Sequence, residues 1–296
     1  MTKPKTATFP RDLALAVANK TVNSSSIDEF LLYLDTELIP KLPKKQSQKS
    51  WRNRFERFST ELKSDRLPYS VFMLKGNTKL PFAAFSTLPI VTCPGIGECR
   101  SWCYSLTAWR YADPYLRQLQ NTLLIKHRKD LITKAVKNLP HEITVRLYVD
   151  GDIDSIQTLN YWMNICKSRS DLSVYGYSKS WELFLKYSET KEFPSNYVLN
   201  LSGGSRYDSD HKTIEAMKKL SCVRGLFVAV NTKTKIKSST ERYSSPEYHK
   251  EVRETARKEH GKKVISCPGF CGSCGKGKHF CGNSDLKDVV IAIGVH

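Results

Sequence analysis

The sequence predicts an α/β protein: a complete or partial (βα) barrel with mostly parallel strands, preceded by a small N-terminal helical module. Short β-rich runs alternate with helical segments from about residue 70 onward, whereas the preceding part shows helical periodicity alone. Strands that alternate with helices form βαβ units and a mostly parallel sheet. An open doubly wound sheet is the alternative. We expect the basic helical module to span residues 1–68 and the barrel-like domain residues 69–296.

Two helices are expected in the N-terminal module. Ser26 followed by Glu29 is a capping-box pattern that opens the first helix, and Pro40 ends it. The second helix is expected over residues 51–62, where aromatic residues share one face and arginines lie elsewhere on the surface.

The barrel-like domain is expected to contain seven strands and five helices. The strands are expected at residues 82–85, 143–149, 172–177, 197–201, 226–230, 264–266 and 289–293. The helices are expected at residues 114–139, 155–167, 180–187, 211–220 and 246–260. In parallel α/β folds the loops after the strand ends form the binding face, so polar residues in these loops are the candidate site residues.

The charge of the chain indicates a polyanionic partner. The 296 residues contain 47 Lys and Arg against 29 Asp and Glu, a net charge of +18. Nucleic acid, and DNA first of all, is the expected partner of such a basic protein. The basic loop at residues 231–242 is a candidate for phosphate contacts through Lys233, Lys235, Lys237 and Arg242.

The sequence predicts neither a membrane span nor secretion. No run of about eighteen apolar residues occurs, and the first residues lead into no apolar signal-peptide core. We therefore expect a cytoplasmic protein. In a reducing cytosol, clustered cysteines are metal ligands more often than disulfide partners.

Three of the nine cysteines, Cys93, Cys99 and Cys103, lie in a loop after the first expected strand. Three thiolates leave one coordination position open, which a catalytic zinc or a substrate-binding iron–sulfur cluster requires. We expect this loop to be the reactive metal site.

Four further cysteines, Cys267, Cys271, Cys274 and Cys281, lie close together near the end of the chain. Their spacing suits either a four-cysteine zinc site or a four-iron cluster, and it does not choose between the two metals. The second cluster, like the first, opens on Cys-Pro-Gly, so the two clusters can also meet at one site.

Polar residues follow three successive expected strands. Asp150, Asp152 and Asp154 follow the second strand, where they can bind Mg²⁺ or Mn²⁺, or cap the next helix. Lys179 follows the next strand on the same rim. These four residues are the catalytic candidates.

A glycine-rich loop follows the third of these strands. Gly203 and Gly204 allow a ligand to approach the backbone closely, and Arg206 can clamp an anion, although an ordinary turn is the alternative.

The chain resembles the gene product 88 family, which is found on phage and plasmid genomes. The matching features are the Cys-Pro-Gly loop at residues 93–104, a strand with a Gly-Asp turn and Trp-containing helix at residues 146–162, the Tyr-x-Lys-Ser segment at residues 177–180, and a terminal cysteine cluster. The resemblance covers roughly residues 80–285.

That architecture is in turn similar to radical S-adenosylmethionine enzymes, in which three cysteines after the first barrel strand hold a four-iron cluster. The resemblance implies that Trp102 and Gly151 lie against S-adenosylmethionine, with Asp150 and Asp152 near its amino group. The cysteine spacing departs from that of these enzymes, because Cys-x5-Cys-x3-Cys replaces the usual Cys-x3-Cys-x2-Cys in the first loop. The usual spacing begins at Cys267 instead.

Three functions remain open from the sequence. The first is an iron–sulfur, radical-type enzyme that modifies nucleic acid, with the terminal cysteines holding an auxiliary cluster or zinc. The second is a plasmid or phage replication protein that nicks DNA with Mg²⁺ or Mn²⁺. The third is a zinc-stapled protein that binds nucleic acid without catalysis. We favour the first, and the oligomeric state is not predicted.

Overall fold

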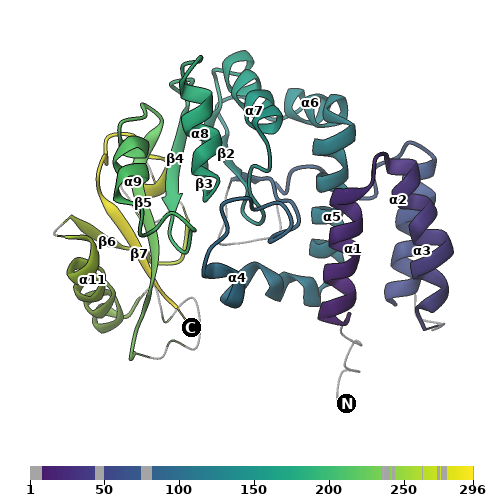
Figure 1. Cartoon of the computed structure of the whole chain (residues 1–296), viewed down its shortest axis with the longest axis horizontal. Helices are drawn as coiled ribbons and strands as arrows, with labels where there is room; N and C mark the ends of the chain where they lie inside the picture. Colours follow the sequence, from purple (N-terminus) through teal and green to yellow (C-terminus); the bar gives the residue numbers. More distant parts are fainter. Residues whose placement is uncertain are drawn as a thin grey trace.

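The computed structural model describes residues 9–43, 50–74, 82–234, 236, 241, 244–261, 263–271, 274 and 279–295. Helices pack against a sheet in which every neighbouring pair of strands is parallel (Figure 1). The predicted α/β class, with a helical segment ahead of the sheet, is confirmed.

Seven strands form the sheet in the described part of the chain. They are β1 (Ala83–Ala84), β2 (Thr144–Leu147), β3 (Ser173–Ser178), β4 (Tyr197–Ser202), β5 (Val223–Asn231), β6 (Val264–Ser266) and β7 (Val290–Val295). Their order is β1-β2-β3-β4-β5-β7-β6, so β7 lies between β5 and β6. Within the described ranges the edge strands β1 and β6 do not pair with each other, and the sheet is an open one.

The helices follow the predicted alternation with two differences. They are α1 (Arg11–Asn23), α2 (Ile27–Tyr33), α3 (Trp51–Lys63), α4 (Cys99–Trp102), α5 (Ala112–His127), α6 (Lys129–Lys137), α7 (Ile156–Ser168), α8 (Trp181–Ser188), α9 (His211–Lys218) and α11 (Pro246–His260). The single helix expected over residues 114–139 is wrong, because Arg128 leaves the helical region (φ −139°, ψ 56°) and separates α5 from α6. Helix α1 was not expected, and no side chain caps its start at Pro10.

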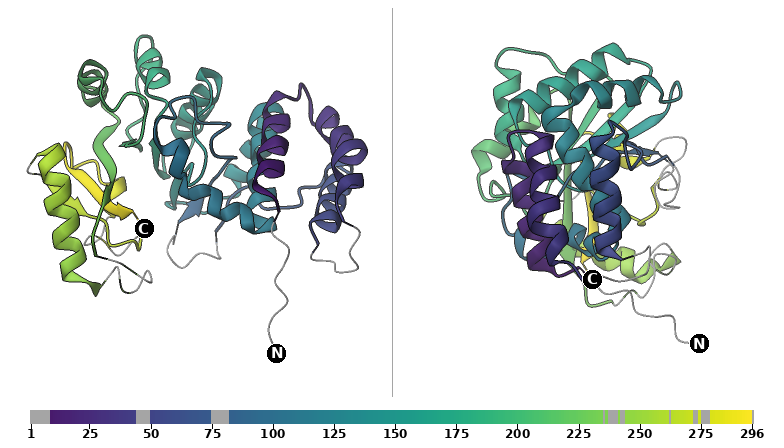
Figure 2. Two further views of the ribbon diagram at one scale, coloured as in Figure 1. Left: turned by 60° about the horizontal axis from the view of Figure 1, so that its bottom comes forward. Right: turned by 90° about the vertical axis from the view of Figure 1, so that its right-hand side faces the viewer.

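The N-terminal helices share their hydrophobic core with α5. Phe30, Phe55 and Phe58 are fully buried in one cluster with Tyr115 and Leu119 of α5. Ser26 accepts a hydrogen bond from the Glu29 N–H at 3.1 Å, which confirms the predicted cap of α2. The helices α1 to α3 therefore pack beside α5, far from α11 and β6 (Figure 1; Figure 2). The predicted boundary near residue 68 stays a prediction.

The two faces of the sheet carry different side chains. Alternate residues of β2 to β4, such as Val145, Val174 and Leu199, pack against the helices α5 to α9. The residues between them, including Tyr175 and Val198, face the segment that connects β6 to β7. This alternation follows from the two-residue period of a strand. The second face is the one on which the cysteine-rich connection lies.

Arg224 is a buried cation at the centre of the sheet, with 1% of its surface exposed. Its Nε donates to Asn200 Oδ1 at 2.6 Å, and its terminal nitrogens donate to the carbonyl oxygens of Val289 at 2.7 Å and Leu226 at 3.2 Å. Burial lowers its pKa. These bonds join β4, β5 and the segment that leads into β7.

None of the helices in the described ranges is both long enough and apolar enough to span a membrane.

Replacing Arg224 with Met should destabilise the protein by about 3 kcal/mol, because it leaves several buried oxygens without a hydrogen-bond donor. Urea unfolding followed by circular dichroism measures the change. The matched control is Arg128→Met, which removes only exposed ion pairs with Asp65 and Asp130 and should cost less than about 1 kcal/mol. Equal losses in the two variants would contradict the role assigned to Arg224.

Candidate functional site

The first cysteine loop follows β1 and docks on the loop after β4. The N–H groups of Gly97 and Cys99 donate to the Gly204 carbonyl oxygen at 3.1 and 3.4 Å, and the Arg206 N–H donates to the Gly95 carbonyl oxygen at 3.1 Å. Because all strands are parallel, both loops lie at the carboxyl edge of the sheet. The structure thus places this loop on the predicted binding face.

Glycine is required where this loop touches its neighbours. A Cβ atom added at Gly95 would lie 1.6 Å from the Lys179 carbonyl oxygen, and one added at Gly97 would lie 2.5 Å from the Ser205 carbonyl carbon. Real side chains never approach backbone atoms so closely. The glycines therefore let the cysteine loop lie directly on the loops after β3 and β4.

Two thiols of the first loop, Cys93 and Cys99, each interact with Lys179 and with Cys103. Burial and the nearby Asp152 raise the pKa of Cys93, while Lys179 acts in the opposite direction. Burial also raises the pKa of Cys99, again opposed by Lys179, and Cys103 interacts unfavourably with both thiolates. Lys179 therefore lies near Cys93 and Cys99, and Cys103 lies near both of these thiols.

Lys179 is held in place by both its backbone and its side chain. Its Nζ donates to Ser202 Oγ at the end of β4 at 2.7 Å, and its backbone N–H donates to Asp152 Oδ2 at 2.7 Å. The ammonium group also acts on Asp208. Lys179 is thus the cation around which three successive loops meet.

No group of three or more His, Cys, Asp or Glu side chains within the described ranges is arranged to hold a metal ion.

The three carboxylates after β2 point to different partners. Asp152 is 4% exposed, and its two oxygens accept the N–H groups of Lys179 and Ile153, each at 2.7 Å. Asp150 accepts a hydrogen bond from Gln118 Nε2 at 3.0 Å. Burial raises the pKa of both carboxyl groups. Asp154 is exposed beside Ser155, which caps α7. The structure does not bring these three residues to one point.

The turn after β2 also depends on glycine. Gly151 has a φ of +76°, and a Cβ atom there would lie 2.1 Å from Thr87 Oγ1. Gly151 therefore allows the chain to turn at this point. The contact of Gly151 with a cofactor stays a prediction.

The glycine-rich loop after β4 uses its own N–H groups internally. Asp208 accepts the N–H groups of Gly204 and Ser205 at 2.6 and 3.2 Å, and the Gly203 N–H donates to the Phe227 carbonyl oxygen at 2.8 Å. An acidic side chain of the protein therefore occupies the place predicted for an anion. A Cβ atom at Gly204 would lie 2.8 Å from Cys99 Cβ, so this glycine serves the docking of the first cysteine loop.

The remaining predicted contacts lie apart from the thiols or outside the described residues. Arg206 is paired with Glu182 at 2.9 Å. Lys233 is exposed, and its backbone N–H donates to Glu251. Three predicted phosphate-contacting residues lie outside the described residues: Lys235, Lys237 and Arg242.

An exposed aromatic segment continues from the first cysteine loop. Trp102 is 41% exposed, Tyr104 61% and Tyr111 68%. The Tyr104 hydroxyl donates to the Val149 carbonyl oxygen at 3.2 Å, which fixes its ring beside the turn after β2. Arg100 and Arg110 are exposed on the same segment. Sequence reasoning considered Trp102 alone; the close spacing of aromatic and basic residues was the signal for the others.

The second cysteine cluster lies on the face of the sheet opposite the helices. Cys267 follows β6, and Cys281 lies in a short helical turn (Phe280–Gly282) that contacts β3 and β4. The Cys281 carbonyl oxygen accepts a hydrogen bond from Asn200 Nδ2 at 2.8 Å, and its thiol is hydrogen-bonded to the Tyr177 hydroxyl. Arg146 Nη1 lies 4.0 Å from Cys271 Sγ.

The four thiols of this cluster are electrostatic neighbours. Burial, and then Cys271 and Cys274, raise the pKa of Cys267 to about 11. Burial and Cys267 raise the pKa of Cys281 to about 12. Cys267 and Cys281 would therefore ionise more readily with a cation to offset the charge.

Polar side chains from β2 and β3 lie beneath the second cluster. Arg146 stacks on the Tyr177 ring at 4.6 Å, and the Tyr175 ring lies 4.5 Å from that of His279. Arg146 Nε, the Tyr175 hydroxyl and His279 Nε2 are buried without a hydrogen-bond partner in the described part of the chain. Sequence reasoning missed Arg146 and Tyr175, although polar residues at alternate positions of expected strands were a signal for an inward-facing site.

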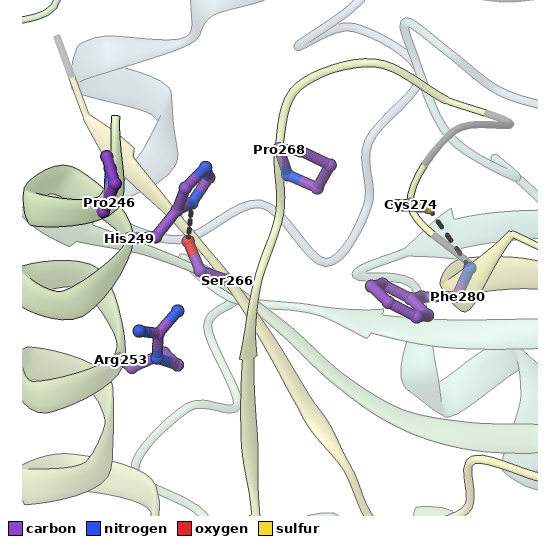
Figure 3. Close-up of a pocket in the computed structure, with 7 residues that line it drawn as sticks. All are labelled: Pro246, His249, Arg253, Ser266, Pro268, Cys274 and Phe280. Atoms are coloured by element: carbon purple, nitrogen blue, oxygen red, sulfur yellow. Dashed lines mark hydrogen bonds between the residues drawn. The ribbon is translucent and has the colours of Figure 1, made fainter. Parts of the chain in front are cut away.

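A cavity of about 410 Å³ opens beside the second cluster (Figure 3). Helix α11 forms one wall, and β6 with the following cysteine loop forms the other. The described residues that line it are Pro246, His249, Arg253, Ser266, Pro268, Cys274 and Phe280.

The comparison with known proteins gives one match. The family model described as Gene product 88 matches residues 57–277. No curated protein and no solved structure matches the chain.

Replacing Gly95 with Ala should displace the first cysteine loop and destabilise the protein by about 2 kcal/mol, because the new Cβ meets the Lys179 backbone. Gly203→Ala is the matched control on the same rim, since its Cβ would approach no atom closer than 3.3 Å and should cost less than about 1 kcal/mol. Thermal unfolding of both variants checks this. Unchanged stability of Gly95→Ala would show that the loop does not dock as described.

Proposed function

The chain belongs to the gene product 88 family, and from this membership and the geometry of its loops we propose that it is an iron–sulfur protein that acts on nucleic acid by radical-type chemistry. One observation supports the proposal: Cys93 and Cys99 each interact with Lys179 and with Cys103 in a loop at the carboxyl edge of a parallel sheet. Ligands of α/β proteins bind at this edge.

Thiols, the donor type of the first loop, suit an iron–sulfur cluster, although the described side chains are not arranged around a metal ion. Thiolates are soft ligands that select iron–sulfur clusters or zinc, and Cys93, Cys99 and Cys103 would hold such a cluster with one position open. The cluster would supply one-electron chemistry to a ligand at that position, such as S-adenosylmethionine. Cys99 is 7% exposed, so water has little access to this side chain.

The residues around the loop would orient the site and bind its ligand. Lys179 would offset the negative charge of the thiolates. Asp152 fixes the Lys179 backbone through its hydrogen bond, so it acts as a positioning residue rather than as a metal ligand. Trp102 is an exposed aromatic residue that directly precedes Cys103, and it would contact the bound cofactor or substrate.

The second cluster would hold an auxiliary cluster or a zinc ion. Cys267, Cys271, Cys274 and Cys281 supply four thiols, which is the number that a closed structural site takes. Arg146 and the Tyr177 hydroxyl lie next to Cys271 and Cys281, where they would donate to sulfur once the thiols are deprotonated.

Nucleic acid is the proposed substrate or substrate carrier. The net charge is +18, and the exposed aromatic residues Trp102, Tyr104 and Tyr111 lie on the same segment as the exposed Arg100 and Arg110. Stacking on aromatic rings combined with cationic side chains is how proteins bind unpaired bases. We therefore propose single-stranded DNA as the partner. Asp150 already accepts a hydrogen bond from Gln118, and Asp152 accepts one from the Lys179 backbone. DNA nicking with Mg²⁺ or Mn²⁺ bound by these carboxylates therefore has less support.

Protein purified without oxygen should be brown and contain about four irons and four sulfides for each four-iron cluster. Alanine variants of Cys93, Cys99 and Cys103 should each lose the first cluster, and Cys281→Ala should lose only the metal of the second. Iron, zinc and sulfide analysis with absorbance spectra measures this.

Cys166→Ala is the control, because Cys166 is buried among apolar residues away from both clusters. Colourless wild-type protein that carries only zinc would exclude the proposed iron–sulfur centre.

Replacing Tyr111 with Leu should weaken binding of a single-stranded oligonucleotide about tenfold, because one stacked base is worth about 1–3 kcal/mol. Tyr111→Phe keeps the ring and should bind as the wild type does. Fluorescence anisotropy at several salt concentrations measures both, and affinity should fall steeply as salt rises. Binding that is insensitive to salt, or equal in the Leu and Phe variants, would contradict the stacking surface.

A further inference from the structure

The cavity beside α11 borders the second cysteine cluster at Cys274, and the rest of its lining indicates a ligand of its own. About 410 Å³ is within the size range of small-molecule sites. Figure 3 shows Arg253 and His249 on one side, Ser266 between the walls, and Phe280 on the opposite side. The lining therefore combines a cationic wall with an apolar one.

Arg253 supplies a positive charge to the cavity wall. It is partly buried in the cavity wall, and none of the described residues forms a hydrogen bond or ion pair with its guanidinium group. A guanidinium has five donors in a planar fork that matches the oxygens of phosphate and carboxylate groups. A cation held in a concave wall favours an anionic ligand.

Ser266 offers a second donor from a different element. It is 8% exposed at the end of β6, and its Oγ lies 2.8 Å from His249 Nδ1. With the proton on Nδ1, His249 donates to Ser266 and leaves the hydroxyl hydrogen for a ligand. Donors from α11 and β6 thus face the cavity from two directions, which suits a tetrahedral group better than a flat one.

The opposite wall suits a flat apolar body. The Phe280 ring and Pro268 line it, and Pro246 closes the end next to His249. Aromatic rings bind flat ligands by stacking. We propose that this cavity binds a small molecule of nucleotide size whose phosphate contacts Arg253 and Ser266 and whose ring system packs against Phe280.

The test is the binding of AMP, adenosine and inorganic phosphate to the full-length protein, measured by isothermal titration calorimetry. AMP should bind at least about tenfold more tightly than adenosine, which lacks the anion, and more tightly than inorganic phosphate, which lacks the ring system. Arg253→Gln should weaken AMP binding at least about tenfold, and Ser266→Ala by a smaller factor.

Arg257→Gln is the matched control, because Arg257 is exposed one turn further along α11 and outside the cavity lining. It should bind AMP as the wild type does. Thermal unfolding and metal analysis of each variant separate loss of binding from loss of fold or of the clusters. The proposal is overturned if AMP binds no better than adenosine or phosphate, if it does not bind at millimolar concentration, or if Arg253→Gln binds it as the wild type does.

Discussion

A buried polar pair, Arg224 with Asn200, determines how the cysteine-rich connection meets the sheet. The Asn200 side chain accepts from Arg224 and donates to the carbonyl oxygens of Gly176 and Cys281, so it joins β3, β5 and the last cysteine. Neither side chain is exposed to water, so their hydrogen bonds are needed to offset the free-energy cost of burying the guanidinium and amide groups. The second cysteine cluster is consequently positioned by the interior of the sheet and not by its own loop alone.

Arg146 relates the two cysteine clusters to each other. Burial opposes its charge, but Tyr177, Tyr175, Tyr104 and Cys271 together raise its pKa well above the ordinary value. Tyr104 follows the first cysteine loop in the chain and Cys271 belongs to the second cluster, so Arg146 interacts with residues of both segments.

The alternation of strands and helices was predictable because each strand has a local apolar pattern, and the cysteine loops were predictable because their spacing is local. Long-range partners were not. Asp152 is engaged by a backbone N–H 27 residues later, and nothing in the sequence around Asp152 indicates that Lys179 provides it. The break at Arg128 contains neither proline nor glycine, and α1 begins without a side-chain cap, so both lacked the usual boundary signals. The sequence indicated that Gly204 lies in a glycine-rich loop with accessible backbone, but it did not indicate that Asp208 accepts the Gly204 N–H.

The position of β7 has a consequence for synthesis on the ribosome. This strand follows β6 in the chain but lies between β5 and β6 in the sheet. Until β7 has emerged, the strand that pairs with both β5 and β6 is missing, so β5 presents an unpaired edge with the apolar residues Val228 and Val230 in it. Exposed strand edges of this kind pair with other chains. The nascent protein therefore passes through a stage vulnerable to aggregation that ends only when residues 290–295 insert.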